Sequence, residues 1–240
     1  MIGHSTLRIS DSMSYPARDA SKIVNKNKFM KITKFGHCCL LIEENGARIL
    51  IDPGSYSTQQ NTVKNIDIVI ITHNHQDHFQ MDSLKAILKN NPQAKIITNK
   101  SIGALLEREG IVFNVVENGQ SITEKGILIE GFGDKHALIH SSRPSIQNTG
   151  YFIANKLFYP GDAFINPQKQ IDILALPVSA PWETIAESID YALELKPKIC
   201  FPVHDGGIKA PGVFYRIPPE VLEPKGIKFV GLEIDKEYEF

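Results

Sequence analysis

The 240-residue chain is predicted to form one α/β domain in which two packed β-sheets are covered by helices on their outer faces. Three observations predict this class. A hairpin pattern followed by strand and helix patterns occurs in the first half of the chain and again in the second. Hydrophobic residues make up 42% of the sequence, enough to bury a substantial core. Strand ends in both halves carry acidic residues and histidines, so a cleft is expected where they meet.

Residues 1–29 read differently from the rest of the sequence. They are polar and lack hydrophobic periodicity, and a regular pattern begins only at Met30. We interpret 1–29 as an extension or flexible leader and 30–240 as the single domain. A basic targeting segment is the alternative, although no clear apolar stretch accompanies its basic residues.

Five strands are predicted in the first half of the domain. They span 32–35, 39–43, 48–51, 67–71 and 95–98. Asn45-Gly46 suits the positive φ of a two-residue hairpin turn, which makes the opening strands antiparallel. The nearly all-apolar run 67–71 is typical of a strand buried on both faces. Two helices are predicted around 95–98, one ending near Asn91-Pro92 and one over 101–109.

The second half of the domain repeats this plan. Its predicted strands span 127–130, 151–154, 157–159, 173–176 and 199–203. Asn155-Lys156 joins the second and third of them as a hairpin. Before the last strand, Ile185, Ile189 and Ala192 have the spacing of the buried face of a helix that begins near Glu183.

The most specific chemical signal is the motif His73-Asn74-His75-Gln76-Asp77-His78, which directly follows the buried strand 67–71. Alternation along the chain lets His73, His75 and Asp77 converge, while His78 turns toward a second point. A loop fixed at one end by a buried strand can therefore hold metal ions. A histidine-rich surface loop without function is the alternative interpretation.

This motif and four others, in order over residues 30–210, resemble the metallo-β-lactamase superfamily. Gly36-His37 with the strand end at Asp52-Pro53-Gly54 is similar to the first motif of that family. The third motif is a histidine after a strand, for which His136 is the better match and His140 the rival. The fourth and fifth motifs match Asp162 in Gly161-Asp162 and His204 at the end of 199–203.

The resemblance implies a four-layer αββα sandwich with two mixed β-sheets and a two-metal site. In that family pattern one metal is held by three histidines, a second by an aspartate and two histidines, and another aspartate bridges the pair. Carried onto this sequence, the first set is His73, His75 and His136, the second is Asp77, His78 and His204, and the bridge is Asp162. The family's first-motif aspartate, Asp52 here, supports the site without binding metal.

A histidine and aspartate ligand set favours Zn²⁺, with two ions expected, and its carboxylates also admit Mn²⁺ or Fe²⁺. Thiolates are not expected to take part. Two such cations lower the pKa of a shared water and produce a hydroxide nucleophile near neutral pH. We therefore expect a hydrolase of a small ester, lactone or phosphodiester, in which Asp77 and Asp162 are the catalytic carboxylates and Asp77 also orients the nucleophile.

Several further residues have two readings. His37 beside Cys38 and Cys39 could form a further metal site, but these residues are interpreted as core, because strands alternate their faces and small buried cysteines commonly behave as hydrophobes. Trp182 either lines the cleft or caps the helix that follows it. Arg143 either grips an anionic substrate or is a solvated surface residue.

Within the superfamily, the start of the domain resembles the branch that includes ascorbate-6-phosphate lactonase. A ribonuclease is the alternative enzyme, but no basic, glycine-rich insert appears and the formal net charge is −1, so no nucleic-acid partner is indicated. A catalytically inactive metal-binding protein would show broken ligand positions, whereas every motif position is filled. Three cysteines do not form a disulfide framework and no apolar run is long enough for a membrane span, so a cytoplasmic enzyme with a small-molecule substrate is expected.

Overall fold

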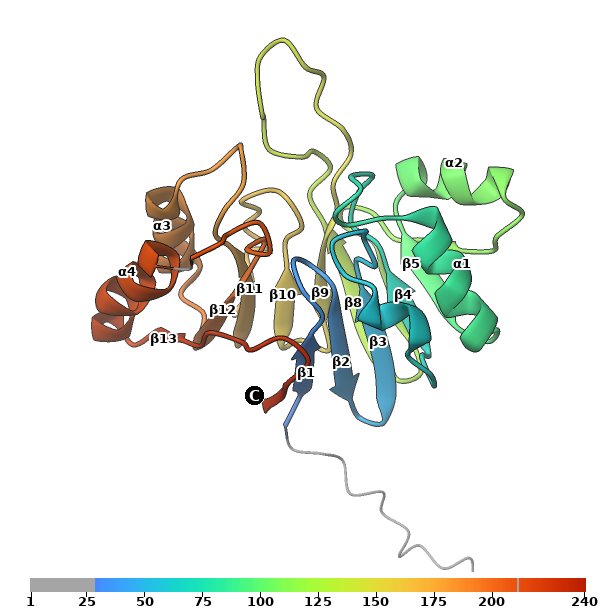
Figure 1. Ribbon diagram of the computed structural model, residues 1–240, viewed down its shortest axis with the longest axis horizontal. Helices are drawn as coiled ribbons and strands as arrows, with labels where there is room; N and C mark the ends of the chain where they lie inside the picture. Colours follow the sequence, from blue (N-terminus) through green and yellow to red (C-terminus); the bar gives the residue numbers. More distant parts are fainter. Residues whose placement is uncertain (1–28, 211) are drawn as a thin grey trace, which may run out of the picture.

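Two seven-stranded sheets pack face to face in the computed structural model, which describes residues 29–210 and 212–240 (Figure 1). Apart from Phe29, the segment interpreted as a leader lies outside the described residues. The strand order is β14-β1-β2-β3-β4-β5-β6 in the first sheet and β13-β12-β11-β10-β9-β8-β7 in the second. No described helix is long and apolar enough to cross a membrane.

The first sheet is built from the first half of the domain and closed by the last strand of the chain. Its strands are β1 (Lys31–Lys34), β2 (Leu40–Glu44), β3 (Ala47–Ile51), β4 (Ile68–Ile70), β5 (Lys95–Thr98), β6 (Asn114–Val115) and β14 (Glu237–Glu239). Strands from β14 to β3 pair antiparallel, and strands from β3 to β6 pair parallel. The sheet is therefore mixed.

The second sheet has the same plan. Its strands are β7 (Ser121–Glu124), β8 (Ile127–Phe132), β9 (Gly150–Ile153), β10 (Leu157–Tyr159), β11 (Ile173–Pro177), β12 (Ile199–Val203) and β13 (Lys228–Phe229). Pairing is antiparallel from β7 to β10 and parallel from β10 to β13. Within each sheet, the strands that lead into the predicted motifs consequently end at one common edge.

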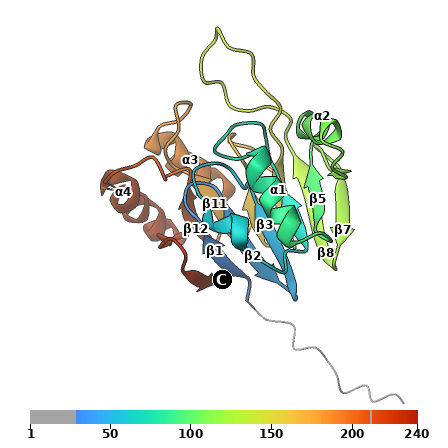
Figure 2. The same cartoon turned by 45° about the vertical axis from the view of Figure 1, so that its right-hand side comes forward.

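Helices cover both outer faces, as Figure 2 shows from a second direction. They are α1 (Met81–Asn90), α2 (Lys100–Arg108), α3 (Ile185–Leu195) and α4 (Gly212–Leu222), with short 3₁₀ helices η1 (Gln59–Thr62) and η2 (Glu223–Lys225). Thr184 caps α3 through a capping box with Glu187, so the helix begins two residues later than the sequence predicts.

Three hydrophobic clusters separate the four layers. The central one joins residues of both sheets, among them Ile49 and Ile153, and is the core of the sandwich. Leu50, the next residue along β3, packs with α1 and α2 instead, because successive side chains of a strand point to opposite faces. A third cluster lies between the second sheet and the helices α3 and α4. The predicted αββα sandwich with two mixed sheets is confirmed.

Candidate metal centre

The predicted ligands, Asp52 and the neighbouring His37 come from the ends of six strands, at the edge from which segment 133–149 rises above the body (Figure 1). The segments that follow β1, β3, β4, β8, β10 and β12 carry, in that order, His37, Asp52, the His73–His78 motif, His136, Asp162 and His204. Residues separated by up to 167 positions thus meet because their strands end side by side.

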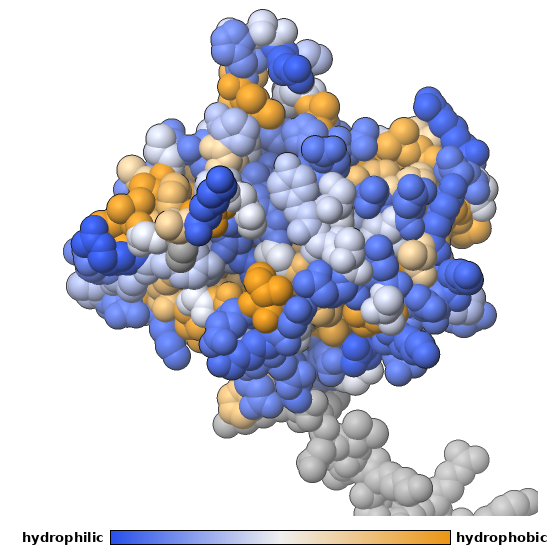
Figure 3. All heavy atoms as spheres, viewed as in Figure 1, coloured by the Kyte–Doolittle hydropathy of each residue, from blue (hydrophilic) through white to orange (hydrophobic). Residues whose placement is uncertain are grey.

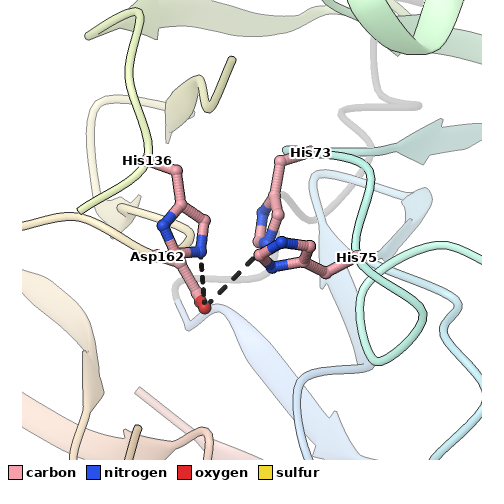
Figure 4. Close-up of side chains that lie close together, drawn as sticks. All are labelled: His73, His75, His136 and Asp162. Atoms are coloured by element: carbon pink, nitrogen blue, oxygen red, sulfur yellow. Dashed lines mark ion pairs between the residues drawn. The ribbon is translucent and has the colours of Figure 1, made fainter. Parts of the chain in front are cut away.

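One cluster contains His73, His75, His136 and Asp162, whose ligand atoms all lie within 4.8 Å of one another (Figure 4). Asp162 Oδ2 is 3.3 Å from His136 Nε2 and 3.9 Å from His73 Nε2. Two ligands bound tetrahedrally to zinc through bonds of about 2.0 Å lie about 3.3 Å apart. The spacing of this cluster is close to what one metal ion requires.

A second cluster contains Asp77, His78 and His204. His204 Nε2 lies 3.3 Å from Asp77 Oδ2 and 3.1 Å from Asp162 Oδ2. His78 Nε2 lies 3.0 Å from Asp162 Oδ1. Asp162 therefore stands between the two clusters, in a position from which its two oxygens can serve both.

Among the described residues, four of the clustered histidines, all except His75, have a hydrogen-bond partner at Nδ1. They face, for His73, His78, His136 and His204 in turn, Thr72 Oγ1 at 3.0 Å, Asp52 Oδ2 at 2.7 Å, Ala137 O at 2.6 Å and Ser179 O at 2.8 Å. Carbonyl and carboxylate oxygens only accept, so these Nδ1 atoms donate, and the Thr72 hydroxyl accepts because it donates to Asp52. Nε2 of each of these rings then faces the site, and once it is unprotonated it offers its lone pair to a metal ion, as metal-binding histidines do.

Several of the inward-facing atoms lack a well-aligned hydrogen bond within the described part of the chain. They are Nε2 of His73, His136 and His204, and Oδ1 of Asp162, all of them buried. A buried polar atom without a partner costs about 1–3 kcal/mol, so it is retained where something else satisfies it. These atoms converge on two points, and the donor set fits divalent metal ions.

Asp52 holds the loop of the His73–His78 motif in place through hydrogen bonds. It is fully buried, and it accepts hydrogen bonds from Thr72 N at 2.8 Å, Thr72 Oγ1 at 2.7 Å and His78 Nδ1. Its backbone adopts a left-handed φ of 45°, a strained conformation that functional sites often retain. Two residues later, a Cβ on Gly54 would lie 2.0 Å from Asp77 O, so only glycine lets this turn approach the loop.

Charges within the metal-free site are strongly coupled. Burial opposes ionisation of Asp162, but the charge of His78 and the nearby rings of His136 and His204 hold the pKa of this carboxyl well below its usual range. Burial also disfavours a charged His204, yet nearby Cys38, Asp162 and Asp77 raise its pKa to about 12. Protons on histidines thus balance the carboxylates where no metal is bound, and metal binding has to release them.

Trp182 faces the site. Its Nε1 donates a hydrogen bond to Asp162 Oδ2 at 3.1 Å, and its ring meets the His136 ring edge-on at 6.2 Å. Thr184 is the residue that caps α3. Of the two readings of Trp182 from the sequence, the helix cap is wrong, and the indole lies against Asp162 and His136.

Both histidines that could match the third motif lie on the segment 133–149, but in different surroundings. His136 is 5% exposed and lies in the first cluster, whereas His140 is exposed and bonds to Ser142 Oγ through Nδ1 at 2.8 Å. Beside His136 a cavity of about 260 Å³ opens, lined on one wall by Arg143. Leu138 and Ile139 also line it and are 60% and 40% exposed, in keeping with the hydrophobic atoms along this projecting segment in Figure 3.

The interpretation of His37 and Cys38 as core residues is wrong in one respect. Both are buried, but His37 Nε2 lies 3.2 Å from Asp77 Oδ2 and Cys38 Sγ lies 3.4 Å from His78 Nε2. The segment 35–39 is irregular, not a strand, so the alternation of faces does not apply to it. Cys39 does pack in the hydrophobic core beneath α1 and α2.

Glu183 is a site neighbour that the sequence analysis did not single out. Its Oε2 accepts a hydrogen bond from Ser188 Oγ at 3.0 Å, while Oε1 is buried and has no hydrogen-bond partner among the described residues. Burial raises the pKa of Glu183 to about 8. Nothing in its local sequence distinguishes it from an ordinary glutamate just before the N-cap of a helix.

Comparison with known proteins gives the family. A model described as beta-lactamase superfamily domain matches residues 31–204. Protein Rv0786c of Mycobacterium tuberculosis is 34% identical over 78% of this chain and 90% of its own length. The UPF0173 metal-dependent hydrolase NEQ378 of Nanoarchaeum equitans is 29% identical over 87% of this chain and 99% of its own length.

A solved structure shows the same architecture. It is that of Igni18, described as a metallo hydrolase from Ignicoccus hospitalis, with a TM-score of 0.71 and 24% identity over 88% of this chain and 98% of that one. The sandwich topology, the order of the motifs and the family model agree, and the chain belongs to the metallo-β-lactamase superfamily.

Proposed function

We propose that this protein is a metal-dependent hydrolase with two metal ions, acting on a small ester, lactone or phosphodiester. The observation that carries the proposal is the convergence of unpartnered, buried Nε2 atoms and the Asp162 carboxylate on two adjacent points. Relatives described as metal-dependent hydrolases support it. The carried-over ligand sets are His73, His75 and His136 for one ion and Asp77, His78 and His204 for the other, with Asp162 shared.

Zn²⁺ suits this donor set, with Mn²⁺ or Fe²⁺ as alternatives, and such ions supply an activated water and polarise the scissile carbonyl or phosphoryl oxygen. The side chain of Asp77 is 16% exposed, against 3% for Asp162. Asp77 is therefore the carboxylate that incoming water reaches, and in our proposal it orients the nucleophile. Asp162, held by Trp182, fixes the distance between the two halves of the site.

The cavity beside His136 is the place proposed for a small substrate, and Arg143 is among the residues that line it. An anionic substrate would gain charge-assisted hydrogen bonds from this arginine. The resemblance to the ascorbate-6-phosphate lactonase branch makes a phosphorylated lactone one member of the substrate panel. Arg143→Ala should then raise the KM for anionic substrates and leave neutral ones unchanged; an unchanged KM for both classes removes Arg143 from the proposal.

The experiment combines metal analysis with turnover. Purified protein should carry about two metal ions per chain and hydrolyse bis-p-nitrophenyl phosphate, p-nitrophenyl esters or members of a lactone panel. Chelator should abolish turnover and added Zn²⁺ or Mn²⁺ restore it. Full activity with no bound metal contradicts the proposal. Metal-loaded protein that is inert on every substrate favours the binding-protein alternative, and cleavage confined to RNA favours the ribonuclease.

A further inference from the structure

Cys38 places a thiol at the edge of the second cluster. It lies in the segment 35–39 between β1 and β2, is 1% exposed, and holds Sγ 3.4 Å from His78 Nε2. A nitrogen at about 2.0 Å and a sulfur at about 2.3 Å from one tetrahedral zinc ion are about 3.5 Å apart. Sγ and Nε2 are within hydrogen-bond distance of each other, and their spacing is also close to that of two ligands on a shared metal.

The neighbouring donors point to the same place. Sγ of Cys38, one ring nitrogen of His204 and one ring nitrogen of His37 lie within 4.8 Å of one another. His204 Nε2 is buried and has no well-aligned hydrogen bond among the described residues, while Nδ1 of the same ring is occupied by Ser179 O. A metal ion between His204, His78 and Cys38 would use the lone pair of this Nε2 once the proton that faces Asp77 and Asp162 has left.

His37 differs from Cys38 in this respect. Gly206 N donates a hydrogen bond to His37 Nδ1 at 2.9 Å, so Nδ1 carries the lone pair and Nε2 carries the hydrogen. That N–H faces Asp77 Oδ2 at 3.2 Å. His37 can therefore position Asp77 but has no free lone pair for a metal, whereas the sulfur of Cys38 has.

We propose that Cys38 is a thiolate ligand of the second metal ion, beside Asp77, His78, His204 and Asp162. The inference rests on the proposed metal-dependent function and deepens it. On binding, the S–H bond breaks, a sulfur–metal bond forms and the proton leaves to solvent. A thiolate is a softer ligand than a carboxylate or an imidazole, so the second site should bind Zn²⁺, Co²⁺ or Cd²⁺ more tightly than Mn²⁺.

Cobalt titration tests this directly, because thiolate ligands give Co²⁺ a near-ultraviolet charge-transfer absorption that nitrogen and oxygen ligands do not. Metal-free protein should develop that band as the second site fills. Cys38→Ser should lose the band but keep the visible cobalt absorption, and its affinity for the second Zn²⁺ should fall at least about tenfold with little change for Mn²⁺. Cys39→Ser, next to it in the core, should keep the band.

A variant that leaves Cys38 intact guards against misfolding of Cys38→Ser. The chain has three cysteines, so Cys39→Ser/Cys200→Ser leaves Cys38 as the only thiol, and the band must persist in it. Two bound cobalt ions without the band, or a band unchanged in Cys38→Ser, overturn the thiolate ligand and leave the hydrolase proposal standing. A protein that binds no cobalt, zinc or manganese overturns both.

Discussion

Trp182 Nε1 donates a hydrogen bond to Asp162 Oδ2, the oxygen that also faces His136 and His204. The indole thus fixes the orientation of the carboxylate that stands between the two clusters. Loss of a group that orients a metal ligand commonly lowers metal affinity or activity by about 10- to 100-fold. Trp182, which lies just before α3, thus connects this helix to the candidate metal centre through a hydrogen bond.

Trp182→Phe should lower kcat about tenfold, because it keeps an aromatic ring against Phe164 but removes the N–H donor. Metal content and kcat of the purified variant measure this. Trp182→Leu, which also removes the ring, should lower stability as well. Wild-type kcat in Trp182→Phe would show that the hydrogen bond does not contribute.

His136→Ala should lose bound metal and at least about 100-fold in kcat/KM, since it removes a ligand atom that nothing nearby replaces. His140→Ala is the matched control on the same segment, because His140 is exposed and lies outside the cluster. It should keep both metal and activity. The reverse result would assign the third motif to His140.

Glu183→Gln should stabilise the metal-free protein at alkaline pH. Burial raises the pKa of Glu183 from 4.5 to about 8, so the folded state holds this proton more tightly than the unfolded state does. The stability that the protonated carboxyl contributes is full below about pH 4 and is lost as the pH rises through 8. At pH 9 the variant should gain about 2 kcal/mol, roughly 4–8 °C in Tm, after discounting for partial exposure.

Melting curves of chelated wild type and Glu183→Gln from pH 4 to 9 measure this difference. Thr184→Ala removes the cap of α3 without touching the carboxyl and should shift Tm equally at every pH, which makes it the control. Parallel curves for wild type and Glu183→Gln would show that Glu183 titrates normally.

Lys34→Ala should destabilise the fold by about 3–5 kcal/mol in urea unfolding. Lys34 is 1% exposed, donates to Pro202 O at 2.8 Å and forms an ion pair with Asp205, to which the Tyr215 hydroxyl also donates. Removing the ammonium leaves the Asp205 charge buried and uncompensated. Lys34→Met/Asp205→Asn removes both charges and should cost less; a double variant as unstable as Lys34→Ala would contradict the charge argument.

The order of the elements was largely readable from the sequence. Strands β5, β10 and β12 have the predicted bounds, and most others differ by one or two residues, as helix and strand ends commonly do. No sequence pattern predicted the short strands β6, β7 and β13, or the helix α4, whose interior contains Pro218 and Pro219. Nor did any pattern predict β14, which pairs with β1 from the other end of the chain.

What the sequence determined by itself is the chemistry available: the His73–His78 motif after a buried strand, and an aspartate and a histidine at strand ends in the second half. Hydrophobic periodicity shows which side chains are buried. In a regular strand or helix, the known geometry of the backbone then tells in which direction each side chain points. The tertiary structure decided between His136 and His140, turned Cys38 toward His78 and set Trp182 on Asp162. Those side chains lie in irregular segments, where the sequence pattern does not fix the direction of a side chain. There the direction depends on contacts with distant strands and on hydrogen bonds to neighbouring carbonyl and amide groups.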